Sequence, residues 1–486
     1  MPLDCESPNI RPLDPKDQWK PIDNIRSLLF IVVREVLNHD ALRVALDELI
    51  RHHLPILGAR IKRNRKNRSL EYHLPRTISE DYALFSWSTR EVHAGLETSD
   101  LLPRVTDKSV TTVSSIPTLE AHWTPCDWPV ERKFDKPDTR LLLVHLTRYT
   151  NSTVVAMNLP HAVADQMGFG SLIRAWLLVY RGEQPPPFLD LSQGQLDGPK
   201  NVSKKEMRTK GKYRLVSRKE KLEINLGLML HLMPPSKEER RTLFFPTALI
   251  ERLRDKHQES LKANYGVASP LLTNGDILAG MLVKLNVTRQ RVLTESTVRG
   301  HHPALPPGQP YLHNALTFST TWRVVHRGTP VSELALYHRV AIIEATKPAA
   351  IDCSLAITRE LFYSRRPMHI CEPFELSHII TNWCSAWRDI DFSCAAVTGA
   401  NGDDCKVSSN APLVFGHSLE RNLPMRCKSH GHSARMRHEK LKEQPQVNSQ
   451  IMCKAEGGYW CDFACTVRNM KLVDALLESD PLLETI

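Results

Sequence analysis

The stretch VVAMNLPHAVADQMGFGSLIRAWLLVY, residues 154–180, carries the most structural information in the chain. Its first part, 154–159, is a short apolar run that predicts a buried strand. From about Gly168 onward, apolar residues recur at helical spacing and predict a helix. His161 and Asp165 lie four residues apart, on the loop between these two elements. A histidine in such a place is held by rigid elements yet open to a ligand, which suits a general base.

The spacing of His161 and Asp165 is weak evidence by itself. A chain with 21 histidines contains about one such pair by chance, and a lone histidine is more often a packed structural residue. Evidence from the other segments of the chain is therefore needed to tell whether His161 is catalytic or structural.

The length of the chain and its apolar runs set the domain organisation that we expect. A chain of 486 residues exceeds the ~250–300 residues at which single cores stop growing. We predict an N-terminal domain at 1–185, a basic crossover linker at 186–240 and a C-terminal domain at 241–486. Within the last of these, segment 394–452 lacks clear periodicity and is expected to be irregular. The helix near 274–285 is expected to begin at Asn274 as its N-cap.

The charge and hydropathy of the chain exclude several classes of protein. The net charge of +10 is concentrated in three segments that lack the interleaved aromatics of a nucleic-acid platform, namely 61–68, 204–221 and 427–442. The first thirty residues hold no signal peptide, and no run approaches the ~20 apolar residues of a membrane span. We therefore expect a cytoplasmic protein that binds neither nucleic acid nor membrane. Its mild positive field would attract a phosphorylated cosubstrate.

Seven segments of the chain together carry a family resemblance. They are LDPKDQW (13–19), DALRVALDELIRHHLPILGARI (40–61), NLPHAVADQMGF (158–169), TNGDILAGMLVKL (273–285), STVRGHHPALPPGQPYLHNAL (296–316), VSELALYHRVAII (331–343) and ITNWCSAWRDIDFS (380–393). In this order they resemble the acyl-CoA-dependent acyltransferases of the BAHD superfamily, especially its fungal natural-product branch. The resemblance spans nearly the whole chain, with gaps at 200–235 and 394–452.

The resemblance implies a fold and a reaction. The fold class would be α/β, with two chloramphenicol-acetyltransferase-like domains whose mixed sheets are flanked by helices. A channel would run between the domains, with His161 near its middle as the general base. The reaction would move an acyl group, commonly acetyl, from acyl-CoA to a hydroxyl of a natural product such as an alkaloid or terpenoid. Acyl-CoA would be a cosubstrate, with no bound cofactor or metal, and a monomer would suffice.

The resemblance also assigns roles to Asp165 and to residues of the second half. Asp165 would pair with Arg299 and turn away from the site, rather than orient His161 as in a catalytic triad. Asp391 would support the site structurally. The pair Thr381 and Trp383 would line the acceptor pocket and polarise the carbonyl, although both could equally be core residues.

Other polar residues of the second half have competing interpretations. Asn314 is a candidate substrate-binding residue, with fixation of a loop as the alternative. The histidines at 301, 302 and 313 are interpreted as structural or solvent-facing. A metal cluster of Cys427 with the histidines at 430, 432 and 438 fits no standard zinc spacing.

Two departures from the family pattern keep other functions open. Gln166 follows Asp165 where many members have glycine, and Ser393 follows Phe392 where the family continues with Gly-Trp-Gly. One alternative is a degenerate member without catalysis. Another is a condensation-type enzyme that uses carrier-bound acyl groups, but those enzymes usually have two adjacent histidines, and Pro160 precedes His161 here.

Overall fold

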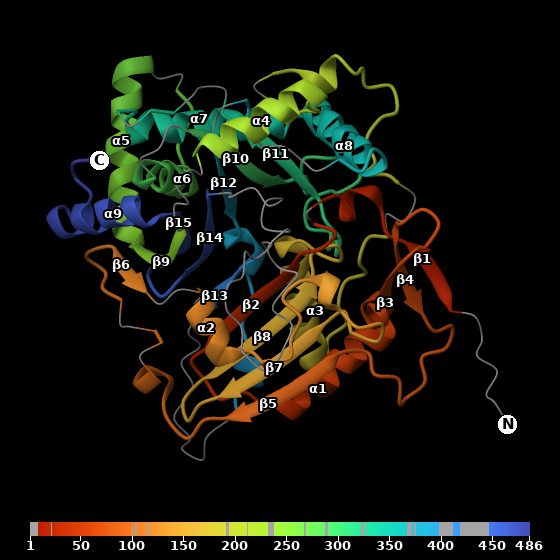
Figure 1. Cartoon of the computed structure of the whole chain (residues 1–486). Coiled ribbons are helices and arrows are strands. Elements are labelled where there is room, and N and C mark those ends of the chain that lie inside the picture. Colours follow the sequence, from red (N-terminus) through yellow and green to blue (C-terminus); the bar gives the residue numbers. More distant parts are fainter. Residues whose placement is uncertain are drawn as a thin grey trace, which may run out of the picture.

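The computed structural model describes most of the chain. The described residues are 8–20, 22–99, 101–102, 105–113, 116–190, 194–210, 212–231, 238–266, 269–286, 290–321, 325–326, 328–366, 372–373, 376–397, 412–417 and 447–486. They form two large mixed sheets with helices packed against them, which confirms the α/β class with mixed sheets flanked by helices (Figure 1).

The first large sheet holds five strands in the order β13-β2-β8-β7-β5. Their bounds are β13 (Leu413–His417), β2 (Arg26–Val33), β8 (Thr153–Pro160), β7 (Leu143–Arg148) and β5 (Ser86–Glu91). All eight residues of β8 are buried, which explains why its sequence is mostly apolar rather than alternating between apolar and polar residues. The strand predicted from residue 154 onward is thus the middle strand of this sheet.

The second large sheet holds seven strands in the order β11-β10-β12-β14-β15-β9-β6. Their bounds are β11 (Leu316–Thr320), β10 (Gln290–Thr297), β12 (Leu376–Asn382), β14 (Val447–Ala455), β15 (Gly458–Thr466), β9 (Glu238–Pro246) and β6 (Thr111–Val113). Strands β10, β12 and β14 run parallel, and the other neighbours are antiparallel. A small third sheet pairs β4 (Leu70–Leu74) with β1 (Asn9–Pro12) and β3 (Arg60–Arg63).

Helices cover both large sheets. They are α1 (His39–Glu48), α2 (Ile116–Trp123), α3 (Gln166–Tyr180), α4 (Arg218–His231), α5 (Thr247–Tyr265), α6 (Asn274–Leu285), α7 (Val331–Ala345), α8 (Pro348–Tyr363) and α9 (Val467–Ser479). Helices α1 and α3 contact each other beside the first sheet, and α5, α6 and α7 pack together beside the second (Figure 1). None of the described helices is long and apolar enough to cross a bilayer. The cytoplasmic location stays a prediction.

The two halves of the chain exchange strands. Strand β6 comes from the first half but pairs with β9 of the second sheet, and β13 comes from the second half but pairs with β2 of the first. Their apolar cores are also joined, because Trp387 and Trp460 belong to the same buried cluster as Phe169 and Leu172. The domain boundaries at 185 and 240 stay a prediction, and the sheets cross them at β6 and β13.

Three local predictions need correction. Segment 394–452 is not uniformly irregular, because it contains β13 and much of β14. Helix α3 begins at Gln166, two residues earlier than expected, because Asp165 caps its first turn. Helix α6 is capped by Thr273 rather than Asn274, through a capping box with Asp276.

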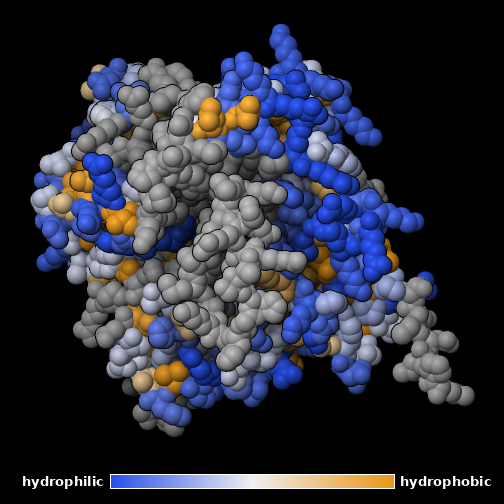
Figure 2. Space-filling view, viewed as in Figure 1, coloured by the Kyte–Doolittle hydropathy of each residue, from blue (hydrophilic) through white to orange (hydrophobic). Residues whose placement is uncertain are grey.

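The crossover stretch packs against the second half. Arg359 of α8 donates hydrogen bonds to the carbonyls of residues 197, 198 and 199, at 2.9, 2.6 and 3.1 Å. Helix α4 follows and exposes Leu222 and Leu226. Figure 2 shows an apolar patch over this helix within a mostly hydrophilic face. The crossover stretch is therefore basic, as its sequence indicated, and hydrogen bonds also hold it against α8.

Two glycines allow α3 to lie directly against the second half. A Cβ atom on Gly168 would lie 1.9 Å from the carbonyl oxygen of Leu312, and one on Gly170 would lie 2.0 Å from that of Ala386. Both obstacles are backbone atoms, which cannot rotate out of the way. Backbone contact at these two points therefore fixes how closely α3 approaches the other half.

We expect Gly168→Ala to destabilise the protein, because the new methyl group forces α3 away from Leu312. Overpacking of this kind costs about 1–3 kcal/mol or more. The measurement is the midpoint of thermal unfolding. The matched control is Gly328→Ala, whose Cβ would meet nothing within 4 Å. Equal melting temperatures for the two variants would contradict the close contact.

Candidate active site

His161 directly follows the middle strand of the first sheet. Its backbone N–H donates to the Ile25 carbonyl at 2.9 Å, which continues the β2–β8 pairing by one residue. The loop position between β8 and α3 is thus as predicted from the sequence. The residue is 6% exposed, and its Nδ1 has no hydrogen-bond partner among the described residues. The backbone of His161 is therefore fixed, while Nδ1 of its ring is not tied to a hydrogen-bond partner in the described part of the chain.

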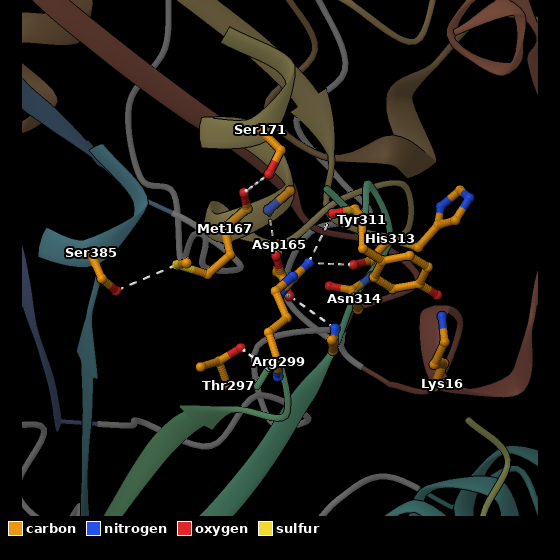
Figure 3. Close-up of polar contacts among 12 residues, drawn as sticks. Lys16, Asp165, Met167, Ser171, Thr297, Arg299, Tyr311, His313, Asn314 and Ser385 are labelled. Atoms are coloured by element: carbon orange, nitrogen blue, oxygen red, sulfur yellow. Dashed lines mark hydrogen bonds and ion pairs between the residues drawn. The ribbon is translucent and has the colours of Figure 1, made fainter. Parts of the chain in front are cut away.

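Asp165 is engaged by groups other than His161. Its Oδ1 accepts the backbone N–H of Gly168 at 2.8 Å, which caps α3. Its Oδ2 lies 2.7 Å from Nη1 of Arg299 and accepts the N–H of Ala315 at 2.9 Å. The ion pair expected from the sequence is therefore present, and both carboxylate oxygens are occupied (Figure 3). This geometry favours the structural role of Asp165 over the triad.

The partners of Asp165 favour the ionised form of its carboxyl. Burial alone would raise the pKa of this carboxyl, but the Arg299 guanidinium and the N–H groups of Ala315 and Gly168 outweigh burial and lower it. A carboxyl with a lowered pKa stabilises the fold at pH values above its ordinary pKa. That contribution is lost as the pH falls through the lowered value. The pair is thus fully charged at neutral pH.

Arg299 joins Asp165 to a loop of the second half, residues 311–315. Its Nη2 donates to the carbonyls of Tyr311 and His313 at 3.2 and 2.8 Å (Figure 3). The guanidinium also lies 5.6 Å from the centre of the Tyr311 ring. One arginine thereby connects the cap of α3 with the 311–315 loop.

The 311–315 loop also contacts the His161 loop directly. His313 Nδ1 lies 2.9 Å from the Val163 carbonyl. Burial lowers the pKa of His313, so a neutral ring donates its N–H to this oxygen. His313 is therefore a structural residue, as the sequence suggested. His302 Nδ1 accepts from the backbone of Ala304, and His301 is exposed, in line with the same interpretation.

Asn314 fixes the loop rather than presenting its amide to a ligand. Its Nδ2 donates to the His161 carbonyl and to Asp17 Oδ1, both at 2.8 Å. The residue is 2% exposed. These contacts favour the alternative of loop fixation, and substrate binding by Asn314 stays a prediction without a contact to support it.

Asn314 contacts a buried ion pair, Lys16 and Asp17, for which the sequence indicated no role. Lys16 Nζ lies 2.5 Å from Asp17 Oδ2 and 5.4 Å from the centre of the Tyr311 ring. Burial alone would lower the pKa of Lys16, but Asp17, Tyr311 and Asp14 together outweigh burial and raise it. The signal was the LDPKDQW segment, where a charged dipeptide interrupts residues that become buried.

Thr381 and Trp383 contact each other at the end of β12. Trp383 Nε1 donates to Thr381 Oγ1 at 3.0 Å. Trp383 is 4% exposed and belongs to the joined core, whereas Thr381 keeps some exposed surface. The core interpretation thus describes Trp383 well, and the pocket role of the pair stays a prediction.

Asp391 lies at the surface. Its carboxylate accepts the backbone N–H and the hydroxyl of Ser393, both at 2.8 Å. The next residue, Phe392, is buried and stacks edge-on against Trp176 at 6.1 Å. Ser393 therefore closes a local turn in place of the family's glycine, and Phe392 rather than Asp391 carries the packing. Cys427 and the histidines at 430, 432 and 438, whose spacing argued against a metal site, lie outside the described residues.

Comparison with known proteins identifies the fold. Acetyltransferase pyiB of Pyricularia grisea is 27% identical over 479 residues, covering 88% of this chain and 89% of that protein. The structure of F. sporotrichioides TRI101 with coenzyme A and T-2 matches with a TM-score of 0.66 at 13% identity, covering 96% and 97% of the two chains. Vinorine synthase matches with a TM-score of 0.55 at 14% identity, covering 97% and 93%. No protein-family model matches the chain.

The chain has the fold of the BAHD-type acyltransferases. The resemblance that the ordered segments indicated is thereby confirmed, together with the two-domain fold of that family. The likeness in fold extends across both halves, because the TRI101 match covers 96% of the chain. The channel between the domains, the monomeric state and the roles of individual site residues stay predictions.

The ion pair can be tested by a double-mutant cycle. We expect Asp165→Asn and Arg299→Ala each to lower the free energy of unfolding, because each leaves a buried partner without its counter-charge. The double variant should lose less than the sum, with a coupling of about 1–3 kcal/mol. Denaturant unfolding of the four proteins measures the coupling. Additive losses would show that the two side chains act independently and would contradict the pair.

Proposed function

We propose that the protein transfers an acyl group, acetyl in the first instance, from coenzyme A to a hydroxyl of a natural product such as an alkaloid or terpenoid. The observation that carries the proposal is that both halves of the chain hold the backbone of His161. Ile25 of the first half and Asn314 of the second both hold its backbone, while its Nδ1 has no partner in the described part of the chain. A base held by both halves can serve two substrates that meet between them.

The relatives support the donor and the class of acceptor. Chains similar to this one over most of its length are named acetyltransferases, including pyiB at 27% identity. Structures with the same fold were solved with coenzyme A and with T-2 or deoxynivalenol as small-molecule partners. We carry over a coenzyme A thioester as cosubstrate and a hydroxylated small molecule as acceptor. A cytoplasmic monomer would suffice for this reaction.

The proposed reaction is direct. His161 takes the proton of the acceptor hydroxyl while the oxygen attacks the thioester carbonyl. The tetrahedral intermediate then collapses, the carbon–sulfur bond breaks, and the imidazolium returns the proton to the coenzyme A thiolate. The products are the ester and free coenzyme A. Neutral imidazole suits this task because histidine changes its charge near neutral pH.

Release of thiol from acetyl-CoA in the presence of a panel of hydroxylated alkaloids and terpenoids tests the proposal. We expect His161→Ala to lower turnover about 10²–10⁴-fold, the usual contribution of a general base. Thermal unfolding of the variant checks that it is folded. The matched control is His301→Ala, which removes an exposed histidine. Near-normal turnover by folded His161→Ala protein would exclude His161 as the base.

The order of the chemical steps gives a second prediction. Direct transfer forms no acyl-enzyme, so protein incubated with radiolabelled acetyl-CoA alone should carry no label after denaturation. Initial rates over both substrates should give intersecting rather than parallel reciprocal plots. Parallel plots, or label that survives denaturation, would indicate a covalent intermediate and contradict the direct route.

A further inference from the structure

A carboxylate that the sequence did not single out, Glu295, lies in the second sheet. It sits in β10, in register with Phe318 of β11 on one side and Thr381 of β12 on the other. Partners in register share one face of a sheet, and successive residues of a strand alternate between faces. Glu295 and Thr381 therefore point to the same side.

That side packs against Trp19 of the first half, Tyr213 and residues of α8. Val292 of β10 and Ile380 of β12 belong to the core that the helices α5 and α6 cover. Val292 lies an odd number of residues from Glu295, and Ile380 lies an odd number of residues from Thr381. Glu295 consequently faces away from these helices. Its neighbour Phe318 packs against Trp19 of the first half at 5.7 Å and against Tyr213 at 4.9 Å. Beyond the end of β10, Arg299 pairs with Asp165 of the loop that holds His161. Both His161 and Asp165 act electrostatically on the Glu295 carboxyl, so the carboxylate lies near the base.

Thr381 lies beside Glu295 on the neighbouring strand. Trp383 Nε1 donates to the hydroxyl oxygen of Thr381 at 3.0 Å, and the Thr381 hydroxyl acts to lower the pKa of the Glu295 carboxyl. A threonine hydroxyl has a single proton to donate. The hydroxyl oxygen of Thr381 accepts from Trp383, so its own proton is available to the Glu295 carboxylate on the neighbouring strand.

Among the described residues, His161 is the group whose positive charge would act on Glu295. Burial raises the pKa of Glu295, although the residue keeps some exposed surface. His161 and the Thr381 hydroxyl act in the opposite direction, and Asp165 raises the pKa further. Arg299 is committed to Asp165 and to two backbone carbonyls. The imidazole is therefore the cation that can offset this carboxylate.

We propose that Glu295 is a positioning residue for the base, whose carboxylate stabilises the imidazolium formed when His161 takes the proton of the acceptor. The inference rests on the proposed function, since it gives Glu295 a role in the same reaction. The proton moves only from the acceptor hydroxyl to His161 and then to coenzyme A. Glu295 acts through its field and forms no bond to either substrate. It thus takes the place that Asp165 holds in the triad interpretation.

The test compares Glu295→Gln with the wild-type protein across a range of pH. Glutamine keeps the size of the side chain and can still accept the Thr381 hydroxyl, so the charge alone is removed. Without the carboxylate the imidazole binds its proton less tightly, so the acid limb of the kcat/KM profile should move about one pH unit lower. Turnover at neutral pH should fall about tenfold, because an imidazolium less stable by one unit is ten times less populated.

The matched control is Glu344→Gln, which removes an exposed carboxylate of α7. This control should leave both the rate and the acid limb unchanged. A purely structural role for Glu295 would lower the rate equally at every pH. An acid limb of folded Glu295→Gln protein that coincides with the wild-type limb would therefore overturn the proposal.

A readout without an acceptor separates this inference from the proposed function. In protein with 15N-labelled histidine, the resonance absent from His161→Ala protein belongs to His161. Its titration should move to lower pH in Glu295→Gln protein. If Glu295→Gln does not fold, Thr381→Val should move the same resonance in the same direction, because loss of the hydroxyl favours uncharged Glu295. An unmoved resonance overturns the inference, whereas an absence of thiol release in the wild type overturns only the proposed function.

Discussion

The ion pair between Asp165 and Arg299 is the interaction on which the site depends. It links positions 134 residues apart, and it caps α3 while it holds the 311–315 loop. A buried pair stabilises a fold only when its desolvation is offset by complete hydrogen bonding. Here both oxygens of Asp165 are occupied, and the arginine bonds two further carbonyls. The position of the His161 loop follows from this pair.

The contacts around the pair make the geometry of His161 a property of both halves of the chain. The 311–315 loop reaches the His161 loop at the carbonyls of His161 and Val163. Gly168 brings α3 against the same loop, because its missing side chain admits the Leu312 carbonyl. Exchange of β6 and β13 between the sheets and a joined core then hold the halves together. Motion of one half against the other would therefore disturb the base directly.

The sequence predicted the parts of this arrangement whose signals are local. Apolar periodicity predicts the strand before His161 and the helix after it. Arg299 is indicated by the family-like segment that contains it. The exchanged strands were not predictable, because β6 and β13 have three and five residues and pair with distant strands. Thr273 and Asn274 are adjacent residues that both cap helices well, so only the bond to Asp276 separates them.

Glu295 shows why a catalytic environment is harder to predict than a catalytic motif. A lone carboxylate in the strand sequence RVLTEST has no periodic or spacing signal, and its meaning comes from register with a strand some eighty residues later. That register puts Thr381, which accepts from Trp383, on the same face of the sheet as Glu295. The imidazolium proposed as the partner of Glu295 forms only when His161 takes the acceptor proton. The partner is therefore created by the reaction, and no motif of the sequence records it.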